Sequence, residues 1–275
     1  MTGNRGAVLV TGASTGIGRA IVDRLAAAGF LVHAGARKEA DLDSLGKLPG
    51  VEPVRIDVTF LADVERAKDA VKSRGVPLVA IVNNAGIAVA GPLVDVDDDD
   101  MLRQFDVNVF GVHRVTRAFL PMLLEAGGRV VMMSSDSGFF ATPFFGPYCA
   151  SKFALEGYAD SLRRELAGHG VKVIVIQPGR VRTPIWDKGE RLLERTSGSV
   201  FEPLAKKIGA HAIARGKEAG IDPAIVAGVV HDAIVARKPK TRYLVARSTF
   251  KYRLVKILPD AAVDRLVAKE LERFR

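Results

Sequence analysis

Short apolar runs rich in β-branched residues recur along the chain, and segments of helical periodicity lie between them. Most of these runs are continuously apolar rather than alternating, which is the pattern of strands covered on both faces of a sheet. We therefore expect a buried central sheet. The predicted strands are Ala7–Thr11, Leu31–Ala34, Val51–Ile56, Leu78–Val82, Arg129–Met133, Val171–Ile176 and Tyr243–Ala246.

The helical segments between the strands set the fold class. Strands that alternate with helices favour a parallel sheet built from right-handed crossovers. We therefore predict an α/β fold of the Rossmann type, a doubly wound, mostly parallel, seven-stranded sheet with helices on both faces. No internal repeat or low-complexity linker divides the chain, so residues 1–247 are expected to form one domain. The predicted helices include Gly18–Ala28, Leu61–Ser73, Met101–Glu125 and Tyr148–Ala167.

Two segments depart from this alternation. Residues 186–220 form a long excursion between a strand and the next helix, and long insertions in compact domains often act as lids or binding loops. Residues 248–275 form a C-terminal extension with two amphipathic helical patterns, Phe250–Leu258 and Asp260–Phe274, on either side of Pro259. We expect the first segment to form a lid and the second to form a pair of short helices.

The composition is that of an ordinary globular protein. Apolar residues make up 48% and charged residues 26% of the 275 positions, which excludes bulk disorder. The lone Cys149 excludes an internal disulfide framework and a cysteine-rich metal site, and we interpret it as a small packing residue. The N-terminal residues lack the apolar stretch of a leader, and no window has the length of a spanning helix. A cytoplasmic protein is expected.

The net charge of +9 is unevenly distributed. Residues 237–275 hold 12 Lys and Arg against 4 Asp and Glu, and the rest of the chain is nearly neutral. This largely removes nucleic acid as the explanation of the charge, and we predict no nucleic-acid partner. Two hypotheses remain for the tail: basic helices that contact an anionic membrane surface peripherally, or helices packed on the domain with a solvated cationic face.

A glycine-rich segment joins the first strand to its helix. Thr11–Gly18 has the spacing Gly-x-x-x-Gly-x-Gly. Glycines allow backbone N–H groups to approach a pyrophosphate closely, and the helix N-terminus adds partial positive charge. We predict a dinucleotide site here; the alternative is a glycine-rich turn that binds no ligand.

The end of the second strand bears on the choice of cofactor. A site for NAD(H) has a carboxylate near this point to bind the ribose hydroxyls, whereas here Ala36 is followed by Arg37 and Lys38. A guanidinium attracts a 2′-phosphate, so the sequence favours NADP(H), with NAD(H) still open. The alternative is that both cations only form a solvated helix entrance.

Tyr148 and Lys152 lie four residues apart in a helical segment, so they share one face. An ammonium near a phenol lowers the phenol pKa, which would give a general acid or base near neutral pH. Such a pair alone is weak evidence, since helices carry it by chance. Ser135, thirteen residues earlier, follows a predicted strand and faces the crevice where open α/β sheets bind ligands.

With these residues in place, the chain resembles the short-chain dehydrogenase/reductase family, in its single-domain branch, and looks most like its steroid- and retinol-dehydrogenase members. The resemblance covers about residues 5 to 245. The matching pieces, all in family order, are Thr11–Gly18, Asp57, Asn83–Gly86, Asn108, Ser135, Tyr148 with Lys152, and Pro178-Gly179 with Thr183.

The resemblance implies an oxidoreductase that interconverts a hydroxyl and a carbonyl group. Tyr148 would donate or accept the proton, Ser135 would hydrogen-bond the reacting oxygen, and Lys152 would bind the nicotinamide ribose and lower the Tyr148 pKa. Asn108 would hold a water of the proton relay. The predicted cofactor-binding residues are Gly12, Ser14, Thr15, Gly16, Ile17, Gly18, Arg37, Lys38, Asp57, Val58, Asn84, Ala85, Gly86, Tyr148, Lys152, Pro178, Gly179, Val181 and Thr183.

The substrate side is rich in phenylalanine. Four of the 13 phenylalanines fall between Gly138 and Pro147, which suggests an apolar wall for a small hydrophobic alcohol or ketone; aromatic packing is the equal alternative. The predicted substrate-binding residues are Ser135, Phe144, Phe145, Tyr148 and Trp186.

Other function classes remain as alternatives. A regulator that senses the nucleotide without turnover would share the fold, and a sugar-nucleotide epimerase would share the Tyr/Lys pair. No histidine has metal-ligand spacing, so no metal is predicted. We interpret the acidic run Asp95–Asp100 as a helix cap rather than a calcium loop. Family resemblance implies a homodimer or homotetramer formed through the two long helices.

Overall fold

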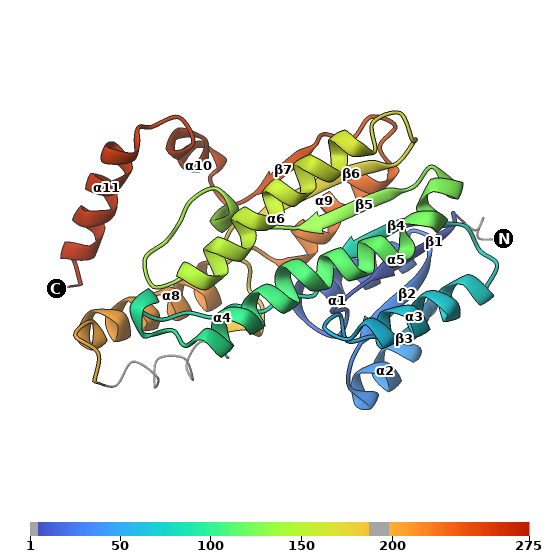
Figure 1. Ribbon diagram of the computed structural model, residues 1–275, viewed down its shortest axis with the longest axis horizontal. Helices are drawn as coiled ribbons and strands as arrows, with labels where there is room; N and C mark the ends of the chain where they lie inside the picture. Colours follow the sequence, from blue (N-terminus) through green and yellow to red (C-terminus); the bar gives the residue numbers. More distant parts are fainter. Residues whose placement is uncertain (1–4, 187–197, 275) are drawn as a thin grey trace.

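The sheet has seven strands and follows the predicted pattern. The computed structural model describes residues 5–186 and 198–274, apart from the side chains of Lys251 and Arg253. All strand pairs are parallel, in the order β3-β2-β1-β4-β5-β6-β7 (Figure 1). The predicted strands are confirmed to within two residues: β1 Ala7–Val10, β2 Leu31–Ala36, β3 Val51–Arg55, β4 Leu78–Asn83, β5 Arg129–Met133, β6 Lys172–Pro178 and β7 Arg242–Val245.

Helices cover both faces of the sheet and bury its apolar strands between two cores. One core packs the sheet against helices α1 (Gly16–Ala27), α2 (Glu39–Gly46) and α9 (Pro223–Val235). The other packs it against α3 (Leu61–Ser73), α5 (Gly111–Ala126) and α6 (Gly146–Glu165). This explains the continuously apolar central strands β1, β4, β5 and β6, because residues of each one contribute to both cores.

The predicted helix Met101–Glu125 is in fact three consecutive pieces. Helix α4 (Asp98–Phe105) passes into a π-turn, Asp106–Phe110, and then into α5. Asn108 lies at the centre of the π-turn and is buried. A π-turn interrupts the regular helical hydrogen bonding and is frequently found at functional sites.

The strand order reverses direction between β1 and β4, which is where doubly wound sheets form a ligand crevice. The Thr11 hydroxyl oxygen fixes this junction, because it accepts hydrogen bonds from the backbone N–H groups of Asn84 and Ala85, each at 3.0 Å. The segments that follow β1, β4 and β5 therefore meet at one edge of the sheet.

The C-terminal extension forms the two predicted helices, α10 (Thr249–Val255) and α11 (Asp260–Glu272), around Pro259. Figure 1 shows α11 projecting from the body of the molecule toward α8 (Glu202–Ala219). The Phe274 ring stacks edge-on against His211 of α8, with the ring centroids 5.0 Å apart. The predicted lid thus contains α8, while residues 187–197 of it lie outside the described part of the chain.

No helix in the described ranges is both long and apolar enough to cross a membrane.

Candidate active site

The turn between β1 and α1 is built so tightly that its glycines are required. Gly12 and Gly16 have φ angles of +62° and +56°, which disfavour other residues. A Cβ on Gly18 would lie 2.1 Å from the carbonyl oxygen of Gly12, and one on Gly12 would lie 2.8 Å from Cα of Ala85. The turn therefore presents bare backbone beside the segment after β4.

The N-terminus of α1 is available for an anion. Thr15 at the N-cap makes no side-chain capping hydrogen bond, and the first turn contains no acidic residue. Its N–H groups and the helix dipole favour a negatively charged ligand. The cradle thus fits the diphosphate of a dinucleotide.

Asn84 and Thr183 bring two further segments to this cradle. The Asn84 amide donates to the carbonyl oxygens of Thr11 and Gly12, at 2.9 and 3.0 Å. The Thr183 side chain, from the loop after β6, lies 3.1 Å from the position of a Cβ on Gly16. The structure thus gathers segments that the sequence predicted to line the cofactor.

Arg37 lies beside Asp57, at the far end of the cradle. Its side chain is 62% exposed, and its Nη1 is 3.3 Å from Oδ2 of Asp57. Burial raises the Asp57 pKa, but hydrogen bonds from Thr59 and the charge of Arg37 outweigh this effect and lower it. Lys38 is exposed at the N-cap of α2. A cavity of about 950 Å³ is lined by Arg37, Thr59, Gly86 and Ile185, among others.

The Ser135 hydroxyl lies just beyond the carboxyl end of β5. Its Oγ donates to Oδ1 of Asp136 at 2.8 Å and accepts from the backbone N–H of Ser137 at 3.1 Å. Pro178, at the end of the neighbouring strand β6, has its carbonyl oxygen 3.4 Å from the same Oγ. Ser135 is thus held between two strand ends in the predicted crevice.

Tyr148 and Lys152 share one face of α6, as predicted. The Lys152 Nζ lies 5.6 Å from the centroid of the Tyr148 ring and donates to the carbonyl oxygen of Met133 at 2.7 Å. Burial lowers the Lys152 pKa to about 8, and the nearby Glu156 carboxylate opposes that shift. Desolvation therefore shifts the Lys152 ammonium toward its neutral form.

The predicted lowering of the Tyr148 pKa does not appear in this structure. Desolvation of the phenol raises its pKa, and the charge of Asp136 adds to that rise, while hydrogen bonding with Ser135 opposes it. Spacing along a helix predicted the pair correctly, but it contained no information on desolvation or on Asp136.

Asn108 belongs to a buried amide cluster beside the acid/base pair. Its side chain accepts from the backbone N–H of Ile87 at 2.9 Å and donates to Oγ of Ser151 at 3.1 Å. Gln104, four residues earlier, accepts from the backbone N–H of Val89 at 2.7 Å and donates to the carbonyl oxygen of Ile87 at 3.0 Å. Together they fix the loop after β4 against α6.

Aromatic side chains near the site are engaged with one another. The Phe144 ring lies 6.4 Å from that of Phe201, which precedes α8. Phe144 has a φ of +64°, a strained conformation for a residue with a side chain. The Trp186 indole donates to the carbonyl oxygen of Val181 at 2.8 Å and fills the space above Gly216 of α8. Their roles toward a substrate stay predictions.

Two smaller predictions are confirmed. Asp97 caps α4, since its side chain accepts from the backbone N–H of Asp100 at 2.6 Å. Cys149 is buried in α6. Among the described residues, no group of histidine, cysteine and carboxylate side chains has the geometry of a metal site.

Sequence reasoning missed Gln104, Asp136 and Tyr252. A signal for Gln104 was present, because its four-residue spacing from Asn108 puts both amides on one helix face. Asp136 directly follows the predicted serine, which was also a usable signal. Tyr252 had none, because it reaches the site through tertiary packing of α10.

A model of the family described as short chain dehydrogenase matches residues 6–191. The chain belongs to this family. The predicted family and the predicted fold are therefore confirmed. This chain is an oxidoreductase with a Rossmann-type nucleotide-binding fold.

Relatives of this short-chain dehydrogenase act on different substrates. An NADPH-dependent 3-dehydrocapnine reductase of Ornithobacterium rhinotracheale is 34% identical, over 97% of this chain and 97% of that protein. The human 17-beta-hydroxysteroid dehydrogenase type 1 is 36% identical, over 87% of this chain and 77% of that protein. A solved short-chain dehydrogenase from Streptomyces avermitilis superposes with a TM-score of 0.77 at 29% identity, covering 97% of this chain and 95% of that one.

Proposed function

We propose that the protein is an NADP(H)-dependent oxidoreductase that interconverts a hydroxyl and a carbonyl group on a small hydrophobic substrate, with Tyr148 as the general acid/base. One observation carries the proposal. The Tyr148 and Ser135 hydroxyls meet at the carboxyl edge of the sheet that also holds the glycine cradle. Acid/base chemistry and a dinucleotide would thus share one crevice.

A bound nicotinamide would supply or accept the hydride, and the residues of the chain would supply or accept the proton and position the substrate. A raised pKa keeps the Tyr148 phenol protonated at neutral pH, which is the state that donates a proton to a carbonyl oxygen. Ser135, which hydrogen-bonds the Tyr148 hydroxyl, would orient the same oxygen. Lys152 would bind the nicotinamide ribose, and its buried ammonium would strengthen that contact.

The preference for NADP(H) rests on the charge at the end of β2. Ala36 leaves this strand end without a carboxylate, and the Arg37 guanidinium is largely exposed, with the cavity beside it. A 2′-phosphate would pair with this guanidinium. The name of the NADPH-dependent relative supports the same choice.

The hydrophobic substrate rests on the aromatic side chains beyond Ser135. Phe139 packs against Tyr252 of α10, and Phe144 packs against Phe201, which precedes α8. The steroid dehydrogenase among the relatives agrees with an apolar alcohol or ketone. The acid/base pair argues against a regulator that only binds the nucleotide, since such a protein needs neither Tyr148 nor the buried Lys152.

Two measurements test the proposed function. Fluorescence titration with NADPH and NADH should give a micromolar dissociation constant for NADPH and a weaker one for NADH. A panel of steroid, retinoid and aliphatic alcohols and ketones should then yield cofactor-dependent turnover. Absence of binding by both nucleotides below millimolar concentration would contradict the proposal.

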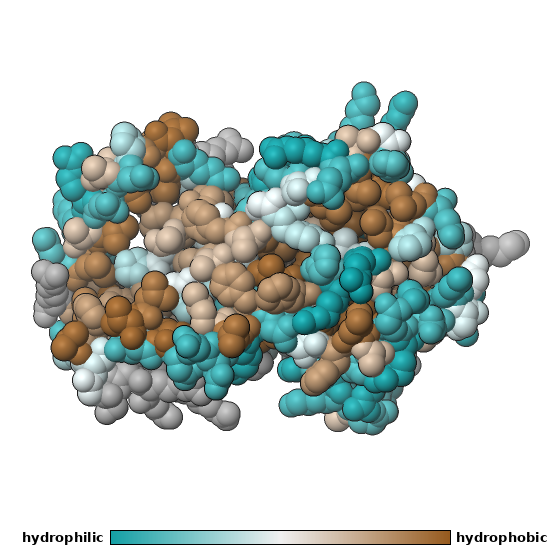
Figure 2. Space-filling view, viewed as in Figure 1, coloured by the Kyte–Doolittle hydropathy of each residue, from teal (hydrophilic) through white to brown (hydrophobic). Residues whose placement is uncertain are grey.

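Assembly as a homodimer or homotetramer is proposed on the long helices. Four large apolar side chains on these helices are exposed. They are Leu102 of α4, Phe110 just before α5, Leu124 of α5 and Phe153 of α6. Figure 2, which views this face, shows apolar surface over these helices. A second copy would cover it. Light scattering after size-exclusion chromatography should give a molar mass at least twice that of one chain. Phe153→Asp should lower this mass. A monomeric wild type would refute the proposed assembly.

A further inference from the structure

The Asp136 carboxylate connects the Ser135 hydroxyl to the C-terminal extension. Its Oδ1 accepts two hydrogen bonds, from the Ser135 Oγ at 2.8 Å and from the backbone N–H of Ser137 at 2.9 Å. Its Oδ2 lies 3.6 Å from the position of a Cβ on Gly179, and the Tyr252 hydroxyl lies 3.4 Å from the same point. Gly179 therefore leaves room for Tyr252 and Asp136 to approach each other.

Tyr252 comes from α10 and lies partly buried at this point. Burial raises the pKa of its phenol, and the Asp136 carboxylate raises it further through its charge and through hydrogen bonding. The Phe139 ring packs edge-on against the Tyr252 ring, with centroids 6.3 Å apart. The raised pKa keeps the Tyr252 phenol protonated at neutral pH, and the protonated phenol is a hydrogen-bond donor to Asp136.

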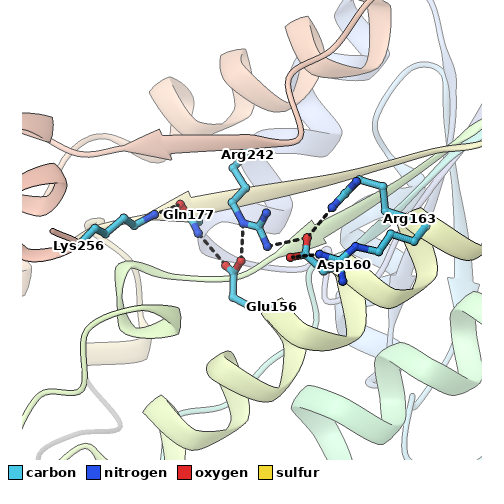
Figure 3. Close-up of polar contacts among 7 residues, drawn as sticks. Glu156, Asp160, Arg163, Gln177, Arg242 and Lys256 are labelled. Atoms are coloured by element: carbon cyan, nitrogen blue, oxygen red, sulfur yellow. Dashed lines mark hydrogen bonds and ion pairs between the residues drawn. The ribbon is translucent and has the colours of Figure 1, made fainter. Parts of the chain in front are cut away.

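A polar network holds α10 against the domain. The Glu156 carboxylate of α6 accepts from Nε of Arg242 on β7 and from the amide of Gln177 on β6, each at 2.8 Å (Figure 3). Lys256, just past α10, has its Nζ 3.4 Å from Oε1 of Gln177 and 3.8 Å from the centroid of the Phe139 ring. The strands of the sheet edge thereby fix the helix that carries Tyr252.

We propose that Asp136 is a positioning residue for the Ser135 hydroxyl, and that Tyr252 fixes Asp136, so that the C-terminal extension completes the active site. The inference rests on the proposed function, in which Ser135 orients the reacting oxygen. Asp136 and the backbone N–H of Ser137 both contact the Ser135 hydroxyl, so they hold its oxygen in place beside the Tyr148 hydroxyl.

The carboxylate also influences the acid/base residue. The titratable groups facing Asp136 are Tyr148 and Cys149 from α6 and Tyr252 from α10, and Arg180 after β6 faces Tyr252. A negative charge here opposes phenolate formation at Tyr148. Asp136 thus favours the protonated Tyr148 that carbonyl reduction requires.

Tyrosine ring carbons provide a test that needs no substrate. The chain has 4 tyrosines, so protein labelled with 13C at tyrosine Cζ gives four assignable signals, and Tyr148→Phe identifies the signal of interest. In Asp136→Asn, the Tyr148 signal should begin to titrate about half a pH unit or more lower than in the wild type. In Tyr252→Phe, the Tyr148 signal should move at neutral pH, because Asp136 is released.

A matched control separates this effect from general perturbation. Tyr243→Phe removes a hydroxyl that accepts from the backbone N–H of Lys240 at 3.0 Å, and it should leave the Tyr148 signal in place. Unchanged Tyr148 signals in both Asp136→Asn and Tyr252→Phe would overturn the proposal. Tyr252→Phe is nearly isosteric and keeps the test open if Asp136→Asn fails to fold. NADPH affinity of the wild type, measured on the same sample, tests the proposed function separately.

Discussion

At the scale of single residues, the acid/base pair of Tyr148 and Lys152 combines two opposite pKa shifts. Desolvation raises the Tyr148 pKa and lowers that of Lys152, so both groups are driven toward their neutral forms. A sequence contains the spacing of such a pair but not its solvation. This is why the pair was predictable and the direction of the Tyr148 shift was not.

Replacing Tyr148 by Phe removes the proposed proton donor and keeps the ring. We expect kcat to fall by at least about 100-fold, the usual contribution of a general acid, with NADPH affinity within about twofold of wild type. Steady-state kinetics and fluorescence titration measure both. Tyr158→Phe on the same helix is the control, since its hydroxyl lies 3.3 Å from Nδ1 of His113, away from the crevice. Undiminished turnover in Tyr148→Phe would exclude the role.

Replacing Arg37 by Asp reverses the charge at the end of β2. The carboxylate repels a 2′-phosphate and can accept from ribose hydroxyls, so the ratio of NADPH to NADH affinity should fall by about tenfold or more. Nucleotide titrations give the ratio directly. Arg273→Asp, which breaks an exposed pair with Glu270, controls for the change in net charge. A constant ratio would refute the proposed contact.

Lys152 predicts a pH dependence of stability in the cofactor-free protein. Its folded pKa of about 8 lies below the value of 10.5 in the unfolded chain. Between these values the unfolded state binds the extra proton, so the free energy of unfolding should rise with pH, by up to on the order of 3 kcal/mol. Urea unfolding of wild type and Lys152→Met at pH 7.5 and pH 10 measures the difference. A gap between the two proteins that is independent of pH would contradict the burial argument.

At the scale of elements, the hydrophobic pattern of the sequence did not predict the π-turn or its amide cluster. Apolar periodicity located α4 and α5 but joined them, because one extra residue in a turn barely alters a run of buried positions. The positions of the strands and of the glycine turn were predictable, because each depends on a local property that the sequence shows directly. The central strands β1, β4, β5 and β6 are buried almost throughout, and the glycines of the turn answer a local steric demand.

The Gln104 side chain satisfies two backbone groups of the loop after β4. Gln104→Ala should lower the free energy of unfolding by about 2 kcal/mol or more, because the N–H of Val89 and the carbonyl of Ile87 lose their partner. Chemical denaturation measures it. Arg103→Ala, on the exposed side of the same helix, should change stability by less than about 1 kcal/mol. Equal effects of both substitutions would show that the loop does not depend on Gln104.

At the scale of the whole molecule, the basic tail remains a proposed membrane contact. Phe250 and Ile257 are 74% and 78% exposed in a segment that carries most of the net charge. Apolar side chains beside cations are typical of interfacial helices. Phe250→Asp with Ile257→Asp should weaken co-sedimentation with vesicles containing anionic lipid, with neutral vesicles as control. No sedimentation of the wild type would favour the alternative, helices with a solvated cationic face.

Because Tyr252 comes late in the chain, the parts of the active site form at different times during synthesis on the ribosome. The cofactor cradle between β1 and α1 emerges before the other elements of the sheet, whereas α10 emerges after every strand. Domains fold from the N-terminus during translation, so a nascent chain would acquire its nucleotide cradle well before its Ser135 is oriented. A chain that stopped after β7 would keep the cradle but would lack Tyr252, so we expect it to bind the nucleotide without a fixed Asp136.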